Sequence, residues 1–473
     1  MDLHNTDDAV TRRVKAITER VAHVKANDLY FYNQPVEEVL PGMKVRVRGR
    51  EMGMYASYSY LGLINHPRIN EASKKALDQF GTGTNGVRSL AGTLTLHTEL
   101  EETIANFKHA EAAVTYSSGY ATNLTVVSTL MGRGDYVFSD KLNHASIVDG
   151  CLMSGAEFRR FRHNDMEHLE GLLKNAPTDI AKLVIADSVF SMDGDIIDLP
   201  KTVELCKKYN AWLMIDEAHS VGVLGAKGTG IEEHFNMYGG IDIKMGTLSK
   251  TIPSVGGYVA ANKDIITYLR HASRAYIFSA ALPPAQAVAA NEAFKVILDE
   301  PWRIERLNQN TKQFIGGLKG MGFDTMLTET AIVPVLCGTD EMAFAMTREA
   351  QHNDVFVLPV VSPAVPEGLA PGAGSLVAAL RASTEREPSV TIGKPGAPMF
   401  EAALRVVGTQ PQHTLMIGDR LNTDIEGAAV LGLATALVLT GVSTRAEAET
   451  AIRPPDGVYD NLVALLSAWG SAL

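Results

Sequence analysis

The chain has 473 residues, 46% of them hydrophobic, which is enough to build two or three domains with sizeable cores and excludes a mainly disordered protein. Its formal net charge of -11, with no basic stretch to offset it, excludes nucleic acid and anionic membranes as expected partners. No apolar run approaches the roughly 20 residues that span a bilayer, no export signal opens the chain and the three cysteines are widely spaced, so we expect a cytoplasmic protein.

Helical spacing of apolar residues predicts an amphipathic helix from Asp8 to about Leu29. From about Thr93 to Val259, helix-like segments alternate with short β-rich runs, which predicts an α/β fold with a mostly parallel sheet covered by helices on both faces. The runs are Ala113 to Tyr116, Tyr136 to Phe138, Lys182 to Ala186 and Ala211 to Ile215. Functional loops are expected at the carboxyl ends of these strands.

The composition changes after Ala370, where Pro371-Gly-Ala-Gly-Ser375 opens a segment rich in alanine, leucine and valine. This segment has its own β/α rhythm around Thr414 to Ile417 and Ala436 to Leu439. The change predicts a domain boundary near residue 370.

Two motifs in the α/β region carry chemistry: Asp216-Glu-Ala-His-Ser220 and, further on, Gly246-Thr-Leu-Ser-Lys-Thr251. An aldehyde cofactor needs a sheltered lysine to form an imine, and a carboxylate one loop earlier keeps a pyridine nitrogen protonated. Either motif alone would indicate a surface lysine or a strand-end cap. In this order, after two apolar stretches, they predict a pyridoxal-phosphate site at Lys250 and Asp216.

Six ordered motifs extend this prediction along the chain. They are Ser117-Ser-Gly-Tyr-Ala-Thr-Asn123, Leu142-Asn-His-Ala-Ser146, Val189-Phe-Ser-Met-Asp-Gly-Asp195, Asp216-Glu-Ala-His219, Gly246-Thr-Leu-Ser-Lys250 and Phe278-Ser-Ala-Ala-Leu-Pro-Pro284. Over about residues 25–369 the chain resembles the α-oxoamine synthases, a family of fold-type I pyridoxal-phosphate enzymes. The resemblance implies an aminotransferase-like large domain at 51–290, an N-terminal helical arm at 1–50 and a small α/β domain at 291–369.

The resemblance also implies a role for each matching residue. Gly119 and Tyr120 would offer backbone N–H groups, and Ser118 its hydroxyl, to the cofactor phosphate at a helix start. His144 would stack on the pyridine ring and later contact the acyl group. Asp216 would pair with the pyridinium nitrogen.

Four further roles follow from the same resemblance. His219 would bind the ring hydroxyl oxygen, Thr247 the phosphate, and Ser191 would help to orient the cofactor. Ser279 would reach the phosphate in a neighbouring subunit, which implies a homodimer with shared active sites. Lys250 would hold the cofactor and, once released, take the α-proton of the amino acid.

The implied reaction joins an amino acid, with glycine, alanine and serine as candidates, to an acyl-CoA or acyl-carrier-protein thioester. Carbon dioxide is lost and an α-amino ketone forms. An aldolase, racemase or transaminase would use the same Lys250 and Asp216, and a non-catalytic binding protein is a further alternative.

Three other signals have plainer explanations. The run Gly81-Thr-Gly-Thr-Asn-Gly86 follows a helix-like segment, so the strand that a dinucleotide loop requires is absent. In the resembling family, the stretch through Arg88 and His97 to Glu101 shapes the substrate entrance. The acids Asp193, Asp195 and Asp198 are expected in a turn after a strand containing Ser191, and we predict no metal site there.

The family pattern is broken at two places. Tyr58-Ser59 stand where two asparagines usually precede Tyr60-Leu-Gly62. Pro371 and Ala373 occupy the positions of an Arg-x-Arg strand whose second arginine grips the substrate carboxylate, and a frequent threonine is Ala364. Arg381 is a weaker candidate for the lost arginine.

From residue 371 to 473 the chain resembles the C-terminal half of a haloacid-dehalogenase-type phosphatase, a partial Rossmann-like segment. The motifs are Gly372-Ala-Gly-Ser-Leu-Val-Ala-Ala-Leu380, Gly393-Lys-Pro395 with Met399-Phe400, and Gly418-Asp-Arg-Leu-Asn-Thr-Asp-Ile425. In that family the equivalents of Asp419 and Asp424 hold magnesium and that of Lys394 steadies a phosphoaspartate. A magnesium phosphatase is therefore an alternative. We predict no phosphatase turnover, because no Asp-x-Asp nucleophile strand precedes the segment.

Overall fold

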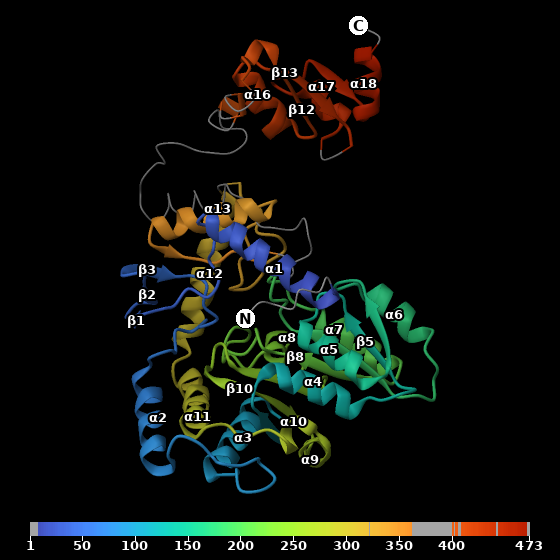
Figure 1. Ribbon diagram of the computed structural model, residues 1–473. Coiled ribbons are helices and arrows are strands. Elements are labelled where there is room, and N and C mark those ends of the chain that lie inside the picture. Colours follow the sequence, from blue (N-terminus) through green and yellow to red (C-terminus); the bar gives the residue numbers. More distant parts are fainter. Residues whose placement is uncertain are drawn as a thin grey trace. The chain divides into compact units, whose positions relative to one another are not determined.

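The computed structural model describes residues 8–320, 322–361, 400–401, 403–404, 408–440 and 443–470 (Figure 1). Contacts within the chain divide it into two compact units, Met1–Pro371 and Gly372–Leu473. The predictions for Ala364, Pro371, Ala373, Arg381 and Lys394 lie outside the described residues.

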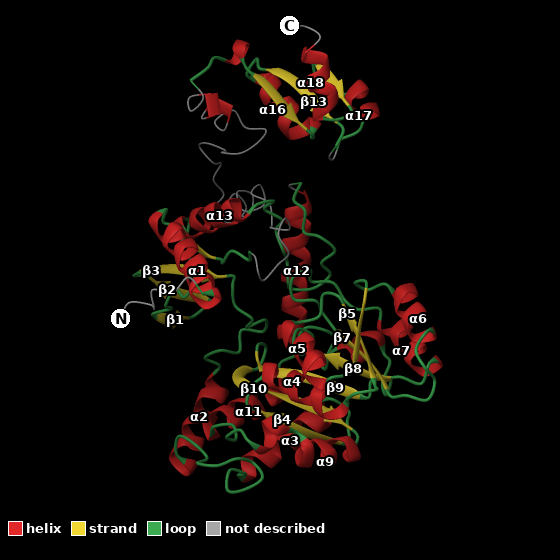
Figure 2. Cartoon of the chain, turned by 45° about the vertical axis from the view of Figure 1, so that its right-hand side comes forward, coloured by secondary structure: helices red, strands yellow, loops and turns green. Residues whose placement is uncertain are grey.

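The centre of the first unit is a seven-stranded sheet with the order β4-β10-β9-β8-β7-β5-β6 (Figure 2). Its strands are β4 (Ala112–Tyr116), β5 (Tyr136–Asp140), β6 (Glu157–Phe161), β7 (Lys182–Asp187), β8 (Trp212–Asp216), β9 (Ile243–Ser249) and β10 (Pro253–Ala261). Strand β10 runs antiparallel to both of its neighbours, while β9, β8, β7, β5 and β6 pair in parallel. The predicted α/β class with a mostly parallel sheet is confirmed.

Helices cover both faces of this sheet, because consecutive strand residues point to opposite sides. In β7, Leu183 and Ile185 join the core beneath α4, α5 and α9, whereas Val184 and Ala186 join the core beneath α6 and α7. A third core lies between the sheet and α2, α3 and α11. These helices are α2 (Pro67–Phe80), α3 (Thr95–Phe107), α4 (Gly119–Leu130), α5 (Ala145–Ser154), α6 (Met166–Lys174), α7 (Leu199–Lys208), α9 (Lys263–Ala272) and α11 (Pro284–Asp299).

A smaller four-stranded sheet, β1-β2-β3-β11, combines segments from distant parts of the sequence. Its strands are β1 (Glu38–Leu40), β2 (Lys44–Val47), β3 (Arg50–Met54) and β11 (Val355–Phe356). Helix α1 (Ala9–Ala26) packs on α13 (Asp340–His352) through Val24, Phe31 and Phe344. The predicted amphipathic N-terminal helix is confirmed, and α13 provides part of the surface that its apolar face requires.

The second unit contains a three-stranded parallel sheet of β12 (Leu415–Gly418), β13 (Ala434–Val438) and β14 (Gly457–Tyr459). The helices α16 (Glu426–Val430), α17 (Arg445–Thr450) and α18 (Leu462–Gly470) follow in alternation with these strands. Two small apolar clusters, centred on Ala428 and Leu437, form its core.

The structure corrects the prediction for Ser191, and the predicted domain borders stay predictions. Ser191 does not lie in a strand: β7 ends at Asp187, and Ser191 belongs to a hairpin closed by the bridge between Val189 and Ile196. The division at residues 50, 290 and 370 stays a prediction, and β3 and α11 run through the first two of these borders. Among the described residues, no helix has the length and apolar character needed to cross a bilayer.

Candidate functional site

The carboxyl ends of the parallel strands surround a cavity of about 270 Å³. This volume lies near the lower end of the ~300–1,000 Å³ range of small-molecule pockets. Residues from five separate segments meet there, because parallel strands place their carboxyl ends on one edge of the sheet. The lining residues are Ser118, Gly119, Tyr120, Asn123, His144, Ser146, Asp187, Ser191, Asp216, Ala218, His219, Met245, Thr247, Ser249 and Lys250.

Lys250, just past the end of β9, forms a chain of contacts with His219 and Tyr60. The Lys250 Nζ lies 2.6 Å from His219 Nε2, and the Tyr60 hydroxyl lies 2.7 Å from His219 Nδ1. Burial lowers the pKa of Lys250, although the charges of Asp216 and Asp187 partly offset the effect. Burial also holds the pKa of His219 well below its ordinary value, with the charge of Lys250 adding to the shift. A neutral imidazole and a readily deprotonated amine therefore lie side by side.

Asp216 is the last residue of β8 and is only 4% exposed. Its Oδ2 accepts a hydrogen bond of 2.7 Å from Asn123 Nδ2, and its Oδ1 accepts one of 2.9 Å from the Ala218 backbone. Asn123 also donates to Ser146 Oγ at 3.0 Å. The carboxylate is thereby held rigidly toward the cavity. The sequence prediction gave no role to Asn123, although the residue lies in one of the six motifs. Its contact with Asp216 depends on tertiary packing, which the motif does not specify.

Helix α4 begins at the cavity, with Ser118 as its N-cap. The Ser118 side chain accepts a hydrogen bond from the Ala121 backbone at 3.1 Å, which leaves the amides of Gly119 and Tyr120 at the open end of the helix. A Cβ on Gly119 would lie 3.0 Å from Thr247 Oγ1. The Tyr120 hydroxyl donates to Asp149 on α5. The helix start thus offers backbone donors and a positive dipole end to an anion.

His144 is the N-cap of α5, and its Nδ1 lies 2.7 Å from Ser146 Oγ. Burial lowers the pKa of His144. Its backbone N–H donates to Asp187 Oδ2 at 2.9 Å. Asp187, at the end of β7, is the register partner of Asp216, and burial together with the Asp216 charge raises the pKa of Asp187 well above its ordinary value. The sequence prediction missed Asp187, although its place at a strand end before the Ser191 motif was a usable signal.

Thr247 and Ser191 line the cavity, and Ser279 does not. Thr247 Oγ1 lies 2.9 Å from Ser249 Oγ and donates to the Gly256 carbonyl at 3.1 Å. Ser279 borders a separate cavity of about 10 Å³ beside Arg88. Within the described part of this chain, Ser279 is therefore not brought together with the other predicted site residues.

The residues expected at a substrate entrance are buried. Arg88 makes a paired contact with Glu101, at 2.8 and 3.1 Å, and His97 Nε2 lies 2.8 Å from the Leu282 carbonyl. None of the three lines the large cavity. Tyr58 instead lies close to Lys250: its ring centroid is 5.5 Å from Lys250 Nζ and 6.0 Å from the His219 ring. Tyr58, which stands where the resembling family usually has an asparagine, thus lies next to the Lys250 amine.

In the second unit, Asp419 follows β12 directly, and Asp424 is 4% exposed. Asp424 Oδ2 accepts a hydrogen bond from the Arg420 backbone at 3.3 Å, and the Asp419 carbonyl accepts one from Ser443. The two aspartates predicted to correspond to magnesium ligands thus both follow β12, with Asp424 in the π-helical turn Leu421–Ile425.

The residues around the first cavity fit pyridoxal phosphate. An aldehyde reacts with a neutral amine, which the lowered pKa of Lys250 favours. A protonated pyridine nitrogen needs a buried carboxylate, and Asp216 provides one. The phosphate needs backbone donors without an intervening side chain, and the closely packed Gly119 at the start of α4 meets that need.

Comparison with known proteins agrees with this geometry. Residues 55–379 match the family model for aminotransferase class I and II. Serine palmitoyltransferase of Sphingobacterium spiritivorum is 41% identical over 74% of this chain and 89% of that relative. 8-Amino-7-oxononanoate synthase of Thermoanaerobacter pseudethanolicus is 42% identical over 75% of this chain and 90% of that relative. A solved serine palmitoyltransferase from S. paucimobilis, with bound PLP and myriocin, gives a TM-score of 0.74 at 34% identity, covering 85% of this chain and 99% of that one.

The chain therefore belongs to the aminotransferase class I and II family, in the α-oxoamine synthase branch to which these relatives are assigned. The predicted family, its fold-type I architecture and pyridoxal phosphate as the cofactor are confirmed. Residues 391–465 match a HAD-hydrolase-like model, which confirms the second resemblance.

Proposed function

We propose that the protein condenses an amino acid with an acyl thioester, with loss of carbon dioxide, and releases an α-amino ketone and a free thiol. The observation that carries this proposal is the half-buried amine of Lys250, held 2.6 Å from His219 in a cavity that also contains Asp216. Relatives named for palmitoyl transfer to serine and for 8-amino-7-oxononanoate synthesis support the acyl-condensing reaction over an aldolase, racemase or transaminase.

Bound pyridoxal phosphate supplies an aldehyde that condenses with amines and an aromatic ring that withdraws electrons from the adjacent carbon. Lys250 would hold this group through its Nζ and, when free, would take the α-proton of the amino acid. Its lowered pKa supports this task, because a general base must be free of its proton near neutral pH. His219 lies beside the same nitrogen and orients it.

Asp216 holds the proton of the pyridine nitrogen, and Asn123 and the Ala218 amide keep its two oxygens in place. His219 binds the ring hydroxyl oxygen. Tyr60 orients His219: when Lys250 donates to Nε2, the neutral ring carries its hydrogen on Nδ1 and donates it to the Tyr60 oxygen.

The phosphate is bound by the amides of Gly119 and Tyr120 together with the hydroxyls of Ser118 and Thr247. His144 stacks on the ring as a neutral imidazole, consistent with its lowered pKa. Ser191 borders the cavity and helps to orient the cofactor.

The substrates are a small amino acid, with glycine, alanine and serine as candidates, and an acyl-coenzyme A or acyl-carrier-protein thioester. The protein acts in the cytoplasm as a homodimer with shared active sites. Ser279 lies apart from the cavity of its own chain, which supports a role in the partner's site.

The test is to supply each candidate amino acid with an acyl-coenzyme A and to measure release of free thiol. We expect release that depends on both substrates and on pyridoxal phosphate. Lys250→Ala should reduce the rate by about 10³-fold or more, whereas Lys75→Ala, an exposed lysine on α2, should leave it unchanged. Cofactor binding without thiol release on any amino acid would contradict the proposal and favour a binding protein.

We also infer that the second unit has no phosphatase turnover, because no Asp-x-Asp nucleophile strand precedes it in the sequence. A phosphate monoester supplied with magnesium should not be hydrolysed above the uncatalysed rate. Hydrolysis that is lost in Asp419→Asn would show that this inference is wrong.

A further inference from the structure

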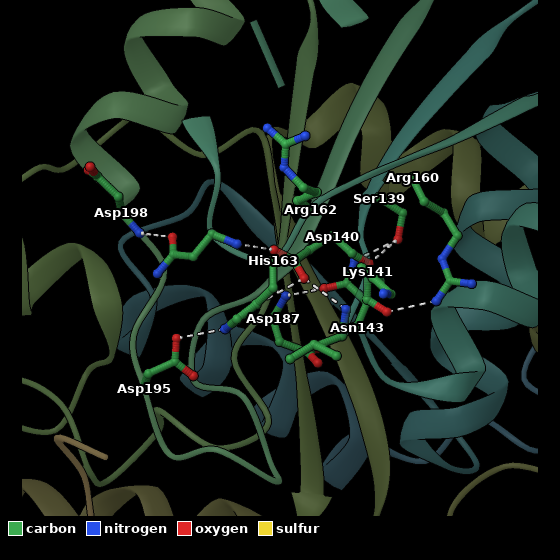
Figure 3. Close-up of polar contacts among 12 residues, drawn as sticks. Ser139, Asp140, Lys141, Asn143, Arg160, Arg162, His163, Asp187, Asp195 and Asp198 are labelled. Carbon is green, nitrogen blue, oxygen red and sulfur yellow. Dashed lines mark hydrogen bonds and ion pairs between the residues drawn. The ribbon is translucent and has the colours of Figure 1, made fainter. Parts of the chain in front are cut away.

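A buried ion cluster outside the cavity is not used by the proposed chemistry (Figure 3). His163, just after β6, lies between two carboxylates: its Nδ1 is 3.1 Å from Asp140 Oδ1, and its Nε2 is 2.9 Å from Asp195 Oδ2. The side chains of Asp140 and Asp195 are 0% and 7% exposed. The ring also contacts Phe190 edge-on, with 4.4 Å between centroids.

Each carboxylate belongs to a segment that leads to the cavity. Asp140 ends β5, and its Oδ1 also accepts a hydrogen bond from the Leu142 backbone at 2.8 Å, two residues before His144. Asp195 lies in the hairpin closed between Val189 and Ile196, which carries Ser191. His163 therefore connects the loop of His144 to the hairpin of Ser191.

On its inner side the hairpin is held by this connection and by Asn164, whose Nδ2 donates to the Ile196 carbonyl at 3.0 Å. Its outer side packs against residues 328–332, since a Cβ on Gly194 would lie 2.3 Å from the Ile332 carbonyl oxygen. On the inner side, Asp195 Oδ1 is buried without a hydrogen-bond partner in the part of the chain that the structure describes. Without His163, the Asp195 carboxylate would lose the donor to its other oxygen as well.

The charges indicate that His163 carries both of its protons. Burial by itself would lower the pKa of His163, but the hydrogen bonds and charges of Asp140 and Asp195 outweigh it and raise the pKa to about 10. Asp193, in the same hairpin, also faces the ring, and burial raises the pKa of Asp193. One imidazolium with two N–H donors thus satisfies two carboxylates.

We propose that His163 is a positioning residue: by bridging Asp140 and Asp195 it holds the His144 loop and the Ser191 hairpin at the spacing that the bound cofactor requires. This inference rests on the proposed roles of His144 and Ser191. Without the bridge, the hairpin moves away from the cavity, so the cofactor is held less tightly and in a less defined orientation.

The test uses the full-length protein loaded with pyridoxal phosphate. His163→Gln and Asp195→Asn are compared with the control His271→Gln, an exposed histidine on α9. Visible circular dichroism per bound cofactor reports how asymmetrically the ring is held, and a cofactor titration reports affinity.

We expect both test variants to lose at least half of the dichroism and to bind the cofactor about tenfold more weakly. The double variant should be no worse than either single one, and the control should match the wild type.

A pH series gives a second readout. The pKa of His163 in the folded state, about 10, exceeds its ordinary value of 6.5. The bridge therefore contributes fully to stability below about pH 6.5, and the contribution disappears as the pH rises to about 10. The melting temperature of the wild type should fall toward that of His163→Gln over this range.

The possible failures are distinguishable. If the wild type binds no cofactor, the proposed function and this inference both fail. If the wild type binds normally and the variants lose melting temperature alone, with unchanged dichroism and affinity, His163 is only a structural residue and the inference is wrong. Asp195→Asn keeps the shape of the side chain and the contact between His163 and Asp140, so it decides the outcome if His163→Gln does not fold.

Discussion

Burial determines the protonation of the ionisable side chains around the cavity. The pKa values of Lys250, His144 and His219 are all lowered by burial, and that of Asp187 is raised by it. All four shifts favour the neutral form, as expected where charge is removed from water. A site of this kind favours the neutral form of its nitrogen atoms, in which they can act as bases.

The raised pKa of Asp187 predicts a pH-dependent stability. In the cofactor-free fold Asp187 keeps its proton at pH values where the unfolded chain has released it, so stability falls as the pH rises above about 4. Asp187→Asn should remove this loss. Its melting temperature relative to the wild type should therefore increase as the pH rises above about 4. The exposed control Asp179→Asn should show no such trend, and a constant difference for Asp187→Asn would mean that Asp187 is ionised.

Asn123 provides a second prediction for a single residue. Asn123→Ala removes the 2.7 Å hydrogen bond to Asp216 Oδ2 and leaves the rest of α4 intact. A hydrogen bond to a charged group contributes about 1.5–3 kcal/mol, so we expect cofactor affinity to fall by about ten- to a hundredfold. A cofactor titration measures this. Asn175→Ala, which removes an exposed contact at the end of α6, should have no effect, and an unchanged affinity in Asn123→Ala would show that Asp216 is held without the amide.

At the scale of elements, the sequence predicts strands that are mainly apolar well, and strands rich in charged residues or glycine poorly. The β-rich runs at Ala113, Tyr136, Lys182 and Ala211 became β4, β5, β7 and β8, with ends shifted by at most two residues. These strands are largely buried and consist mainly of apolar residues. Strand β6 has three charged residues among five, and β10 contains two glycines, so neither has that pattern.

The start of α4 gives a prediction for an element junction. A Cβ on Gly257 of β10 would lie 2.8 Å from the Gly119 Cα and 2.4 Å from Thr122 Oγ1. Gly257→Ala should therefore displace the helix start, destabilise the fold by about 1–3 kcal/mol and weaken cofactor binding. Gly171→Ala on α6 is the matched control: its Cβ meets nothing within 4 Å, and alanine should stabilise the helix by about 0.5–1 kcal/mol. Thermal melting and cofactor titration measure both, and normal binding by Gly257→Ala would contradict the tight packing at this junction.

At the scale of the whole molecule, every residue that lines the cofactor cavity belongs to the first compact unit. A chain of residues 1–371 should therefore fold and bind pyridoxal phosphate with the affinity of the full-length protein. Absorbance titration and size-exclusion chromatography test this. Loss of binding on deletion of residues 372–473 would show that the second unit contributes to the site.

Shared active sites give a further prediction for the assembly. If Ser279 serves the partner's cofactor, a mixed dimer of Lys250→Ala and Ser279→Ala chains contains one site with both defects and one site with neither. Mixing the two weakly active variants should therefore restore part of the thiol-release activity at limiting cofactor. If Ser279 serves its own chain, every site keeps one defect and no activity returns.

The sequence by itself determined the family and the cofactor and predicted most of the candidate site residues that line the cavity, because Lys250, Asp216 and their companions stand in ordered motifs at strand ends. It also predicted the fold class, because the apolar pattern of a buried parallel sheet is local. Only the tertiary structure decided that Asn123 holds Asp216, that Asp187 joins the cavity and that His163 links two cavity loops. These contacts join residues 23 to 93 positions apart, and their strength depends on burial, which no local pattern of residues specifies.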